Sequence, residues 1–429
     1  MAEKKKEFGI GILRGNLFWL VICQCIWMFT VNIPRPYLPL YIQTLGGSPT
    51  DIGLTNSLAT LAGLFLYPLG GFIADKSGRV KLVGFATVFY AISFLPFAFA
   101  QNWQTLAAAS FFQNLVLFYA PILTVLQADS IPAGMRSQGF AIAMSVPAAL
   151  GIISPYIGGL LVDSLGIGGA MYITYMVGFG AGLLVAFLRW IKLTETLDAS
   201  KVEKIDFRNI PKLLKDSYVS TFETIRWMPT PIRDLAVLQV LKVFFVGIAA
   251  SFWIVYATGV LGLTAYWWGI TSAISGFARL LVSYPVGRVL DRVGRSKLIR
   301  PALLITPLLP LYFLGIVDPF QLVMLVIVMA GVNAFLMPGF QSLLADYTPR
   351  ERRGRVTSVI GGGQFYVDIR GGQFGGGILL FIPQAVAQYI GGYLYGYDPT
   401  FPFYVMAAGL VITAGWAWLK VKDPEKLFV

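Results

Sequence analysis

Long apolar stretches recur along the whole chain, and no other feature restricts its fold as strongly. A helix needs about 20 mostly apolar residues to cross the hydrocarbon core of a bilayer. Backbone groups inside a bilayer must find their hydrogen bonds within the protein, which favours helices. We therefore expect an all-α polytopic membrane protein. Its twelve predicted transmembrane helices are residues 17–41, 52–74, 82–100, 106–126, 140–161, 170–188, 235–261, 267–290, 298–317, 320–344, 378–394 and 403–419.

The composition excludes several other classes of protein. Hydrophobic residues make up 56% of the 429 positions and charged residues 13%, about half the charged share of a soluble domain. A soluble enzyme could not bury so much apolar surface, and a disordered chain has the opposite composition. There is no histidine, and the only cysteines are Cys23 and Cys25. Two positions apart on one helix, they cannot form a disulfide framework, and we expect no metal and no cofactor.

The basic residues are distributed unevenly over the predicted turns. Nearly all of the 33 Lys and Arg residues lie at the two termini, in the turns after the second, fourth and eighth helices, before the eleventh, and in the central stretch from Arg189 to Arg233. The opposite turns contain none. Because cytoplasmic loops carry the excess of Lys and Arg, we expect a cell-membrane protein with both termini in the cytoplasm.

The chain also contains an internal repeat. A motif at the end of the second helix and in the turn after it contains Gly71, Asp75, Gly78 and Arg79. These four residues recur 216 positions later as Gly287, Asp291, Gly294 and Arg295. Downstream, Asp129 and Arg136 recur 217 positions later as Asp346 and Arg353. Parallel repeats are typical of transporters that hold their substrate between the repeats, near the membrane midplane. The sequence thus predicts two six-helix parallel-repeat bundles around a central cavity, at residues 1–189 and 233–429, joined by a cytoplasmic linker at 190–232 that contains an amphipathic helix.

The doubled Gly-x-x-x-Asp-x-x-Gly-Arg turn resembles the signature of the major facilitator superfamily. The resemblance implies a secondary transporter that works by alternating access, and not an enzyme. It also implies that Asp75 bridges to the end of helix 11 and Asp291 to the end of helix 5, which would close the cytoplasmic side. We expect the repeated residues named above to form this cytoplasmic gate. The alternative is a solvated basic turn that only sets the topology.

A second motif bears on the direction of transport. Ser154, Pro155, Gly158 and Gly159 resemble the Gly-Pro-x-x-Gly-Gly end of the helix 5 motif of antiporters, including drug exporters. The match is half-complete, because Ser154 replaces the glycine before the proline. Paired glycines also occur where helices simply pack closely.

Ionisable groups inside membrane spans are costly, and they are candidates for substrate binding. Arg35, Lys242 and Arg279 fall inside predicted spans. Arg35 lies between Pro34 and Pro36, which interrupt the helix, and the resemblance places helices 1 and 7 at the cavity. The alternative for these three cations is that they snorkel to the interface. Amides inside the spans are further candidates, and their alternative role is only to join helices. The candidate amides are Gln24, Gln113, Asn114, Gln239 and Asn333.

No Asp or Glu lies deep inside a predicted span, although a buried carboxylate is the usual proton-coupling group. The one candidate is Asp368, in a Gly-rich insertion at residues 361–377 that is absent from the first half of the chain. Proton coupling through Asp368, an acid in a turn or Lys242 is therefore a hypothesis.

The leading functional prediction is a monomeric secondary transporter, of the antiporter type, that exports amphipathic or drug-like compounds, with the proton as the candidate coupling ion. Phe-, Met- and Trp-rich helices suit an apolar, tolerant pocket. An organic-anion uptake or exchange carrier is the alternative, and a lipid scramblase or flippase is the candidate from a different class. The chain has no phosphate-binding loop, metal cluster or catalytic triad, which excludes an ATP-driven pump and a hydrolase. We expect a small-molecule substrate and membrane lipid as partners, and no nucleic acid.

Overall fold

The structure is a computed structural model that describes residues 13–76, 78–132, 135–197, 210–361 and 377–423. All regular elements in these ranges are helices, and each of the twelve predicted stretches falls on one helix or on helices joined end to end. The first half of the chain forms α1 (Gly15–Val31), η2 (Arg35–Tyr37), α2 (Leu38–Thr44), α3 (Pro49–Lys76), α4 (Arg79–Ile92), α5 (Phe94–Ala98), α6 (Trp103–Val116), η3 (Leu117–Tyr119), α7 (Ala120–Asp129), α8 (Arg136–Gly151) and α9 (Ser154–Lys192).

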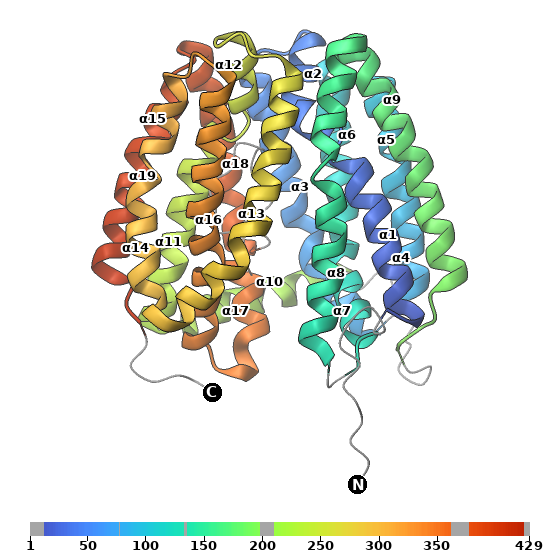
Figure 1. The fold of residues 1–429 in the computed structure, drawn as a ribbon. Coiled ribbons are helices and arrows are strands. Elements are labelled where there is room, and N and C mark those ends of the chain that lie inside the picture. The colour runs from blue at the N-terminus through green and yellow to red at the C-terminus, as the bar shows by residue number, and fades with distance from the viewer. Residues whose placement is uncertain (1–12, 77, 133–134, 198–209, 362–376, 424–429) are drawn as a thin grey trace.

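The second half follows the same order of long and broken helices (Figure 1). Its elements are α10 (Ile210–Trp227), α11 (Thr230–Ala249), α12 (Trp253–Gly259), α13 (Ala265–Val293), α14 (Arg295–Ile305), α15 (Leu308–Leu314), α16 (Pro319–Tyr347), η7 (Arg350–Arg352), α17 (Arg353–Ile360), α18 (Ile378–Tyr397) and α19 (Phe401–Lys420).

Nine helical stretches among the described residues are long and apolar enough to cross a membrane. One of them, residues 138–192, joins the fifth and sixth predicted spans. A turn was expected between these spans, and at that place α9 has a single break at Gly166. The φ of Gly166 is 71°, a conformation that glycine adopts freely. Twelve spans in two bundles therefore stay a prediction.

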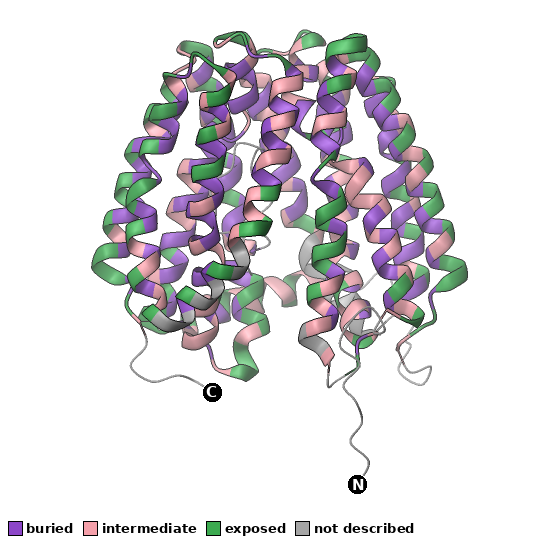
Figure 2. Ribbon diagram, viewed as in Figure 1, coloured by how far each residue is buried: buried purple, intermediate pink, exposed green. Residues whose placement is uncertain are grey.

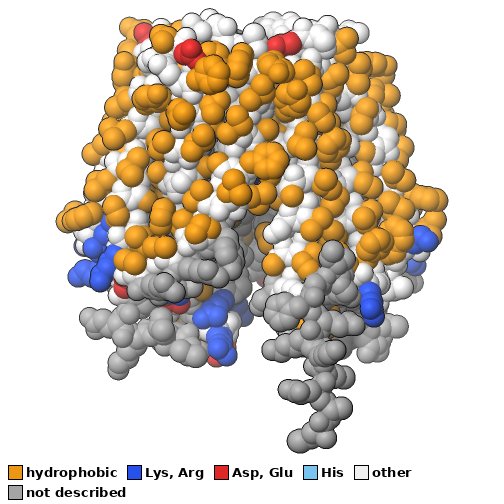
Figure 3. Space-filling model, viewed as in Figure 1, with side chains coloured by type: hydrophobic (Ala, Val, Ile, Leu, Met, Phe, Trp, Pro, Cys, Tyr) orange, Lys and Arg blue, Asp and Glu red, His pale blue; other side chains and the backbone are white. Residues whose placement is uncertain are grey.

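Buried and exposed residues alternate along the long helices, with the exposed ones on the outside of the molecule (Figure 2). Large apolar side chains dominate that outer surface, and Leu281 and Leu419 are 76% and 71% exposed. Figure 3 shows this apolar belt, with Lys and Arg gathered at one end, which we call the basic end. The opposite end is called the outer end. An apolar belt bounded by charge is the expected surface of a membrane-embedded protein.

Two helix pairs join the two halves of the chain near the outer end. α3 packs along α18, and the first part of α9 packs along α13. A Cβ atom on Gly53 of α3 would lie 2.5 Å from the carbonyl oxygen of Gln388. One on Gly159 of α9 would lie 2.4 Å from the carbonyl oxygen of Ala265. Small residues allow such close backbone approach, so glycine is required at both contacts.

The helix expected in the linker is α10. It contacts both α3 and α17, and Figure 1 shows it running across the basic end between the two halves. The hydroxyl of Tyr218 donates a hydrogen bond to the carbonyl of Leu64. The Arg352 guanidinium lies 4.2 Å from the ring centre of Trp227. Phe222 of the same helix is 66% exposed.

Close packing of α18 on α11 gives a direct test of this fold. A Cβ atom on Gly391 would lie 1.9 Å from the carbonyl oxygen of Ile248, whereas one on Gly415 of α19 would meet nothing within 4 Å. We predict that Gly391→Ala lowers the thermal transition of the detergent-solubilised protein, because overpacking costs about 1–3 kcal/mol. Gly415→Ala should leave the transition unchanged or raise it, since Ala favours a helix over Gly. Equal transitions for the two variants would contradict this packing.

Candidate functional site

A cavity of about 280 Å³ lies at the junction of the broken first helix with its neighbours. Its described wall comes mostly from the first half of the chain, and the second half contributes residues of α18 and of the segment around the start of α12. Residues of both halves therefore contribute to its described wall. The lining residues are Trp27, Met28, Val31, Asn32, Pro34, Arg35, Pro36, Leu38, Pro39, Asn56, Ala59, Tyr90, Phe94, Phe97, Ser110, Gln113, Asn114, Leu117, Tyr175, Ala250, Ser251, Ile254 and Gln388.

The break in the first helix presents Arg35 to this cavity. α1 ends at Val31, and Arg35 begins the short helix η2, as the flanking prolines predict. Pro34 and Pro36 are buried, while Arg35 is exposed and lines the cavity. The next residue, Tyr37, is fully buried, and its hydroxyl donates to the carbonyl of Pro155 at 2.6 Å. This contact fixes the segment that carries the arginine.

Five aromatic rings form one wall of the cavity and pack against one another. Trp27 meets Tyr90 edge to face, with ring centres 4.7 Å apart. Tyr90 meets Phe94 at 5.5 Å, and Phe97 stacks on Tyr175 at 4.8 Å. Because the rings support each other, they give a large, rigid apolar surface.

Amides and hydroxyls supply the remaining polar groups of the wall. Gln113 donates to the Ser93 hydroxyl at 3.0 Å, and Asn114 donates to the Ser110 carbonyl at 2.8 Å. Across the halves, Asn56 donates to the Ser251 hydroxyl at 3.1 Å. These bonds hold the amides in place and leave the carbonyl oxygens of Gln113 and Asn114 available as acceptors.

Only some of the predicted binding residues meet in this cavity. Arg35, Gln113 and Asn114 line it, whereas Lys242 and Gln239 are buried in α11 and are not among its described lining residues. Arg279 in α13 and Asn333 in α16 are also absent from the described lining residues. Gln24 lines a separate pocket of about 10 Å³ beside Gln127.

Sequence reasoning missed other polar residues of the wall. These are Asn32, Asn56, Ser110, Ser251 and Gln388. Their shared signal is a polar side chain within an apolar run, but many such residues only join helices. The sequence alone therefore does not distinguish polar residues that line the cavity from polar residues that only join helices.

The first cation of the basic central stretch, Arg189, is buried inside the first half of the chain. α9 continues to Lys192, so Arg189 belongs to this helix and is only 1% exposed. It donates to the hydroxyl of Thr87 at 2.5 Å, and its guanidinium carbon lies 5.9 Å from the ring centre of Tyr119. The helical run thus extends one turn past the last apolar residue of the predicted span, residues 170–188.

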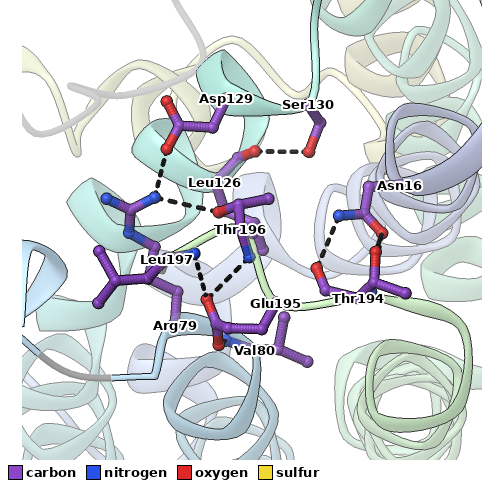
Figure 4. Close-up of polar contacts among 10 residues, drawn as sticks. All are labelled: Asn16, Arg79, Val80, Leu126, Asp129, Ser130, Thr194, Glu195, Thr196 and Leu197. Atoms are coloured by element: carbon purple, nitrogen blue, oxygen red, sulfur yellow. Dashed lines mark hydrogen bonds and ion pairs between the residues drawn. The ribbon is translucent and has the colours of Figure 1, made fainter. Parts of the chain in front are cut away.

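The basic end carries an ion pair that is repeated in the two halves. Arg79 pairs with Asp129, and Arg295 pairs with Asp346 (Figure 4 shows the first pair). All four residues belong to the repeated motifs of the sequence. Each pair joins two helices of the same half of the chain, α4 to α7 or α14 to α16, and the Arg79 side chain is only 6% exposed.

A second repeated contact was not predicted. The backbone N–H of Val80 donates to the carboxylate of Glu195 at 3.0 Å, and that of Ser296 donates to Asp423 at 2.8 Å. Each acid follows the last long helix of its half and meets the first turn of α4 or α14, where the helix dipole favours a negative charge. Asn16 exchanges hydrogen bonds with the backbone of Thr194 beside the first of these contacts (Figure 4). The ends of the helices in each half are thus tied together.

Several predicted gate residues lie outside this description. The side chains of Asp75, Asp291 and Arg136, together with Gly71 and Gly287, are not among the described side chains, and Asp368 lies outside the described residues. Gly78 and Gly294 immediately precede α4 and α14. Arg353 begins α17 and donates to the carbonyl of Thr348 at 3.2 Å.

The antiporter-like motif lies at the contact between the two halves near the outer end. Its Pro155 carbonyl accepts the bond from Tyr37, and its Gly159 meets Ala265 of α13. A Cβ atom on Gly158 would lie 2.5 Å from the carbonyl oxygen of Ile33. Ser154 is fully buried. The motif therefore lets α9 approach both the broken first helix and α13.

The ion pair of the first half generates a prediction. We predict that Asp129→Asn lowers the thermal transition, because it leaves the buried guanidinium of Arg79 without its carboxylate, and bonds to charged groups contribute about 1.5–3 kcal/mol. Arg79→Gln should lower the thermal transition of the Asp129→Asn variant by less than it lowers that of the wild type. Glu223→Gln on the exposed side of α10 is the matched control and should change nothing. Strictly additive effects in this double-mutant cycle would refute the coupling.

Comparisons with known proteins agree with the helical architecture. A sequence profile of the Major Facilitator Superfamily matches residues 20–365 and 235–428. The multidrug resistance protein MdtG of Citrobacter koseri is 26% identical over 341 residues, which cover 76% of this chain and 79% of that protein. MdtG of Salmonella typhimurium is 28% identical over 336 residues, with the same shares of both chains.

Solved structures share the fold at low sequence identity. A POT family transporter in complex with a thioalcohol-conjugated peptide gives a TM-score of 0.68 at 14% identity, over 94% of both chains. The inward-open xylose transporter XylE of E. coli gives 0.66 at 13%, over 95% of this chain and 96% of that one. The human organic anion transporter MFSD10 gives 0.62 at 15%, over 94% and 98%.

Proposed function

Because the chain belongs to the major facilitator superfamily, we propose that it exports small amphipathic, drug-like compounds by alternating access. The family and the multidrug-resistance relatives place the protein among multi-pass membrane transporters rather than enzymes. Export as the direction, and drug-like compounds as the substrates, come from those relatives and from the antiporter-like motif at Pro155 and Gly159.

The observation that carries this proposal is the cavity at the broken first helix. Its volume of about 280 Å³ is near the lower end of the range for small-molecule sites, which are typically apolar with a few placed polar groups. The aromatic wall that runs from Trp27 to Tyr175 fits this pattern. A surface of rings binds many flat or apolar compounds without strict shape selection.

Contacts between the two halves favour an inward-open state. Near the outer end, α3 meets α18 and α9 meets α13 at glycine contacts. At the basic end, the repeated ion pairs stay within each half, and Figure 3 shows the surface hollowed between the halves. We propose that the basic end is cytoplasmic, and that the protein has twelve spans in two bundles that rock about the cavity.

The opposite state needs a gate at the basic end. We propose that Asp75 and Asp291, in the doubled turn, close it by reaching the other half, and that α10 limits how far the halves separate. Contacts of α10 with both α3 and α17 support the second role. Proton coupling through Asp129, Asp368 or Lys242 stays part of the proposal, and the transport assay below tests it.

Transport by the purified protein tests the function. In proteoliposomes we expect a fluorescent amphipathic dye to accumulate against its gradient when a pH gradient is imposed, and to equilibrate when the gradient is collapsed. Protein-free liposomes are the control. Movement of labelled lipid between leaflets without dye accumulation would instead indicate a scramblase. No gradient-driven movement of any compound in a chemically broad panel would contradict the export proposal.

A crosslink between the middle of α3 and the middle of α18 tests alternating access. The Thr60 hydroxyl donates to the side-chain oxygen of Gln388 at 2.7 Å, which joins α3 to α18. In a background without Cys23 and Cys25, Thr60→Cys with Gln388→Cys should crosslink, lose transport, and recover it after reduction. A pair within one turn, Asn102→Cys with Thr105→Cys, should crosslink without loss, since those residues already bond each other. Full transport by the crosslinked 60–388 protein would rule out opening at this contact.

A further inference from the structure

We propose that this cavity selects substrates with an anionic group, which Arg35 binds, attached to an aromatic or apolar body, which the ring wall holds. The inference rests on the proposed export function and names its substrate class. It distinguishes this site from a pocket for lipophilic cations, which a wall of rings alone would also suit.

The balance of charge in the wall carries the argument. Arg35 is the one ionisable cation among the described lining residues, and none of those residues is Asp or Glu. No described residue forms an ion pair with Arg35 or accepts a hydrogen bond from its side chain in the structure. The fixed positive charge therefore faces a largely apolar space with no protein counter-charge in the described wall.

Electrostatics then separate the classes of ligand. Charges interact more strongly inside a protein than in water, because the effective dielectric constant is lower. An arginine in such a space is stabilised by an anion and opposes the entry of a second cation. Its planar guanidinium also matches carboxylate, sulfonate and phosphate groups with two parallel hydrogen bonds.

The backbone around Arg35 is built to hold that charge in place. Pro34 and Pro36 fix φ on either side of it, and buried Tyr37 anchors η2 to α9 through the Pro155 carbonyl. A group that is already positioned loses less entropy when a ligand binds. Snorkelling alone would need a long, free side chain at an interface, and would not need a segment anchored between two helices.

The rest of the wall suits the other end of the same ligand. The rings of Tyr90, Phe94 and Tyr175 line the cavity together with Arg35. Asn32 and Gln113 add neutral polar groups to the same wall. A flat, apolar body beside an anionic group thus matches both surfaces, whereas a small inorganic anion would leave the ring wall unused.

Two dyes with one ring system and opposite charge test the proposal. Fluorescein is an anion and rhodamine 123 a cation, and both share a xanthene body. Binding of each dye to the purified full-length protein is measured by fluorescence anisotropy for wild type, Arg35→Lys, Arg35→Gln and the control Lys420→Gln. Lys420 is an exposed cation at the end of α19 and does not line the cavity.

The wild type should bind fluorescein at least about tenfold more tightly than rhodamine 123, the scale of a charge-assisted hydrogen bond. Arg35→Gln should remove this preference by weakening fluorescein binding about tenfold or more, while rhodamine 123 binding stays equal or tightens. Arg35→Lys should fall between the two, because it keeps the charge and loses the planar fork. Lys420→Gln should match the wild type.

Tighter binding of rhodamine 123 than fluorescein by the wild type would overturn the inference, as would an equal loss of both dyes in Arg35→Gln at an unchanged thermal transition. If Arg35→Gln does not fold, the relative affinities of the wild type and of Arg35→Lys for the two dyes still test the inference. Gradient-driven transport of rhodamine 123 alone would contradict the anion selectivity and would support the export function. Failure to transport either dye or any other compound would remove the export function itself.

Discussion

Backbone contact between helices of the two halves is the constraint on which the rest of the structure depends. Gly53 and Gly159 allow α3 and α9 to meet α18 and α13 closely enough that no side chain fits between them. These contacts close the outer end beside the cavity. They also fix the position of the broken first helix, because Tyr37 bonds to the Pro155 carbonyl at the same junction. The position of Arg35 in the cavity wall therefore depends on the contacts at this junction.

The basic end is organised on a different principle. There the polar contacts lie within each half, where Arg79 pairs with Asp129 and Arg295 with Asp346, and acids after the last helices meet the starts of α4 and α14. Such contacts stiffen each half without joining the two. Two stiff bodies that meet at one end and part at the other are what the proposed rocking transporter needs, and α10 crosses the end at which we propose that they part.

Much of this was predictable from sequence, for identifiable reasons. Apolar length predicted the positions of the helices, and the doubled motif contains the residues of both ion pairs, although the pairing of Arg79 with Asp129 and of Arg295 with Asp346 was not predicted. Pro34 and Pro36 predicted the break that exposes Arg35. By contrast, Gln239 and Lys242 were expected at a cavity, and they are not among the described lining residues of this one. Rotation about a helix axis decides which polar side chain faces a cavity, and that rotation depends on packing partners far away in sequence.

Distances across both ends of the protein test alternating access most directly. Spin labels on exposed residues of opposite halves, Lys81 with Lys297 at the basic end and Asn102 with Val317 at the outer end, report the two separations by pulsed electron resonance. Gly159→Leu cannot keep the contact with Ala265, so it should prevent closure of the outer end. Alternating access predicts that this variant lengthens the 102–317 distance and shortens the 81–297 distance. Unchanged distances, or an increase at both ends, would contradict the reciprocal movement of the two halves.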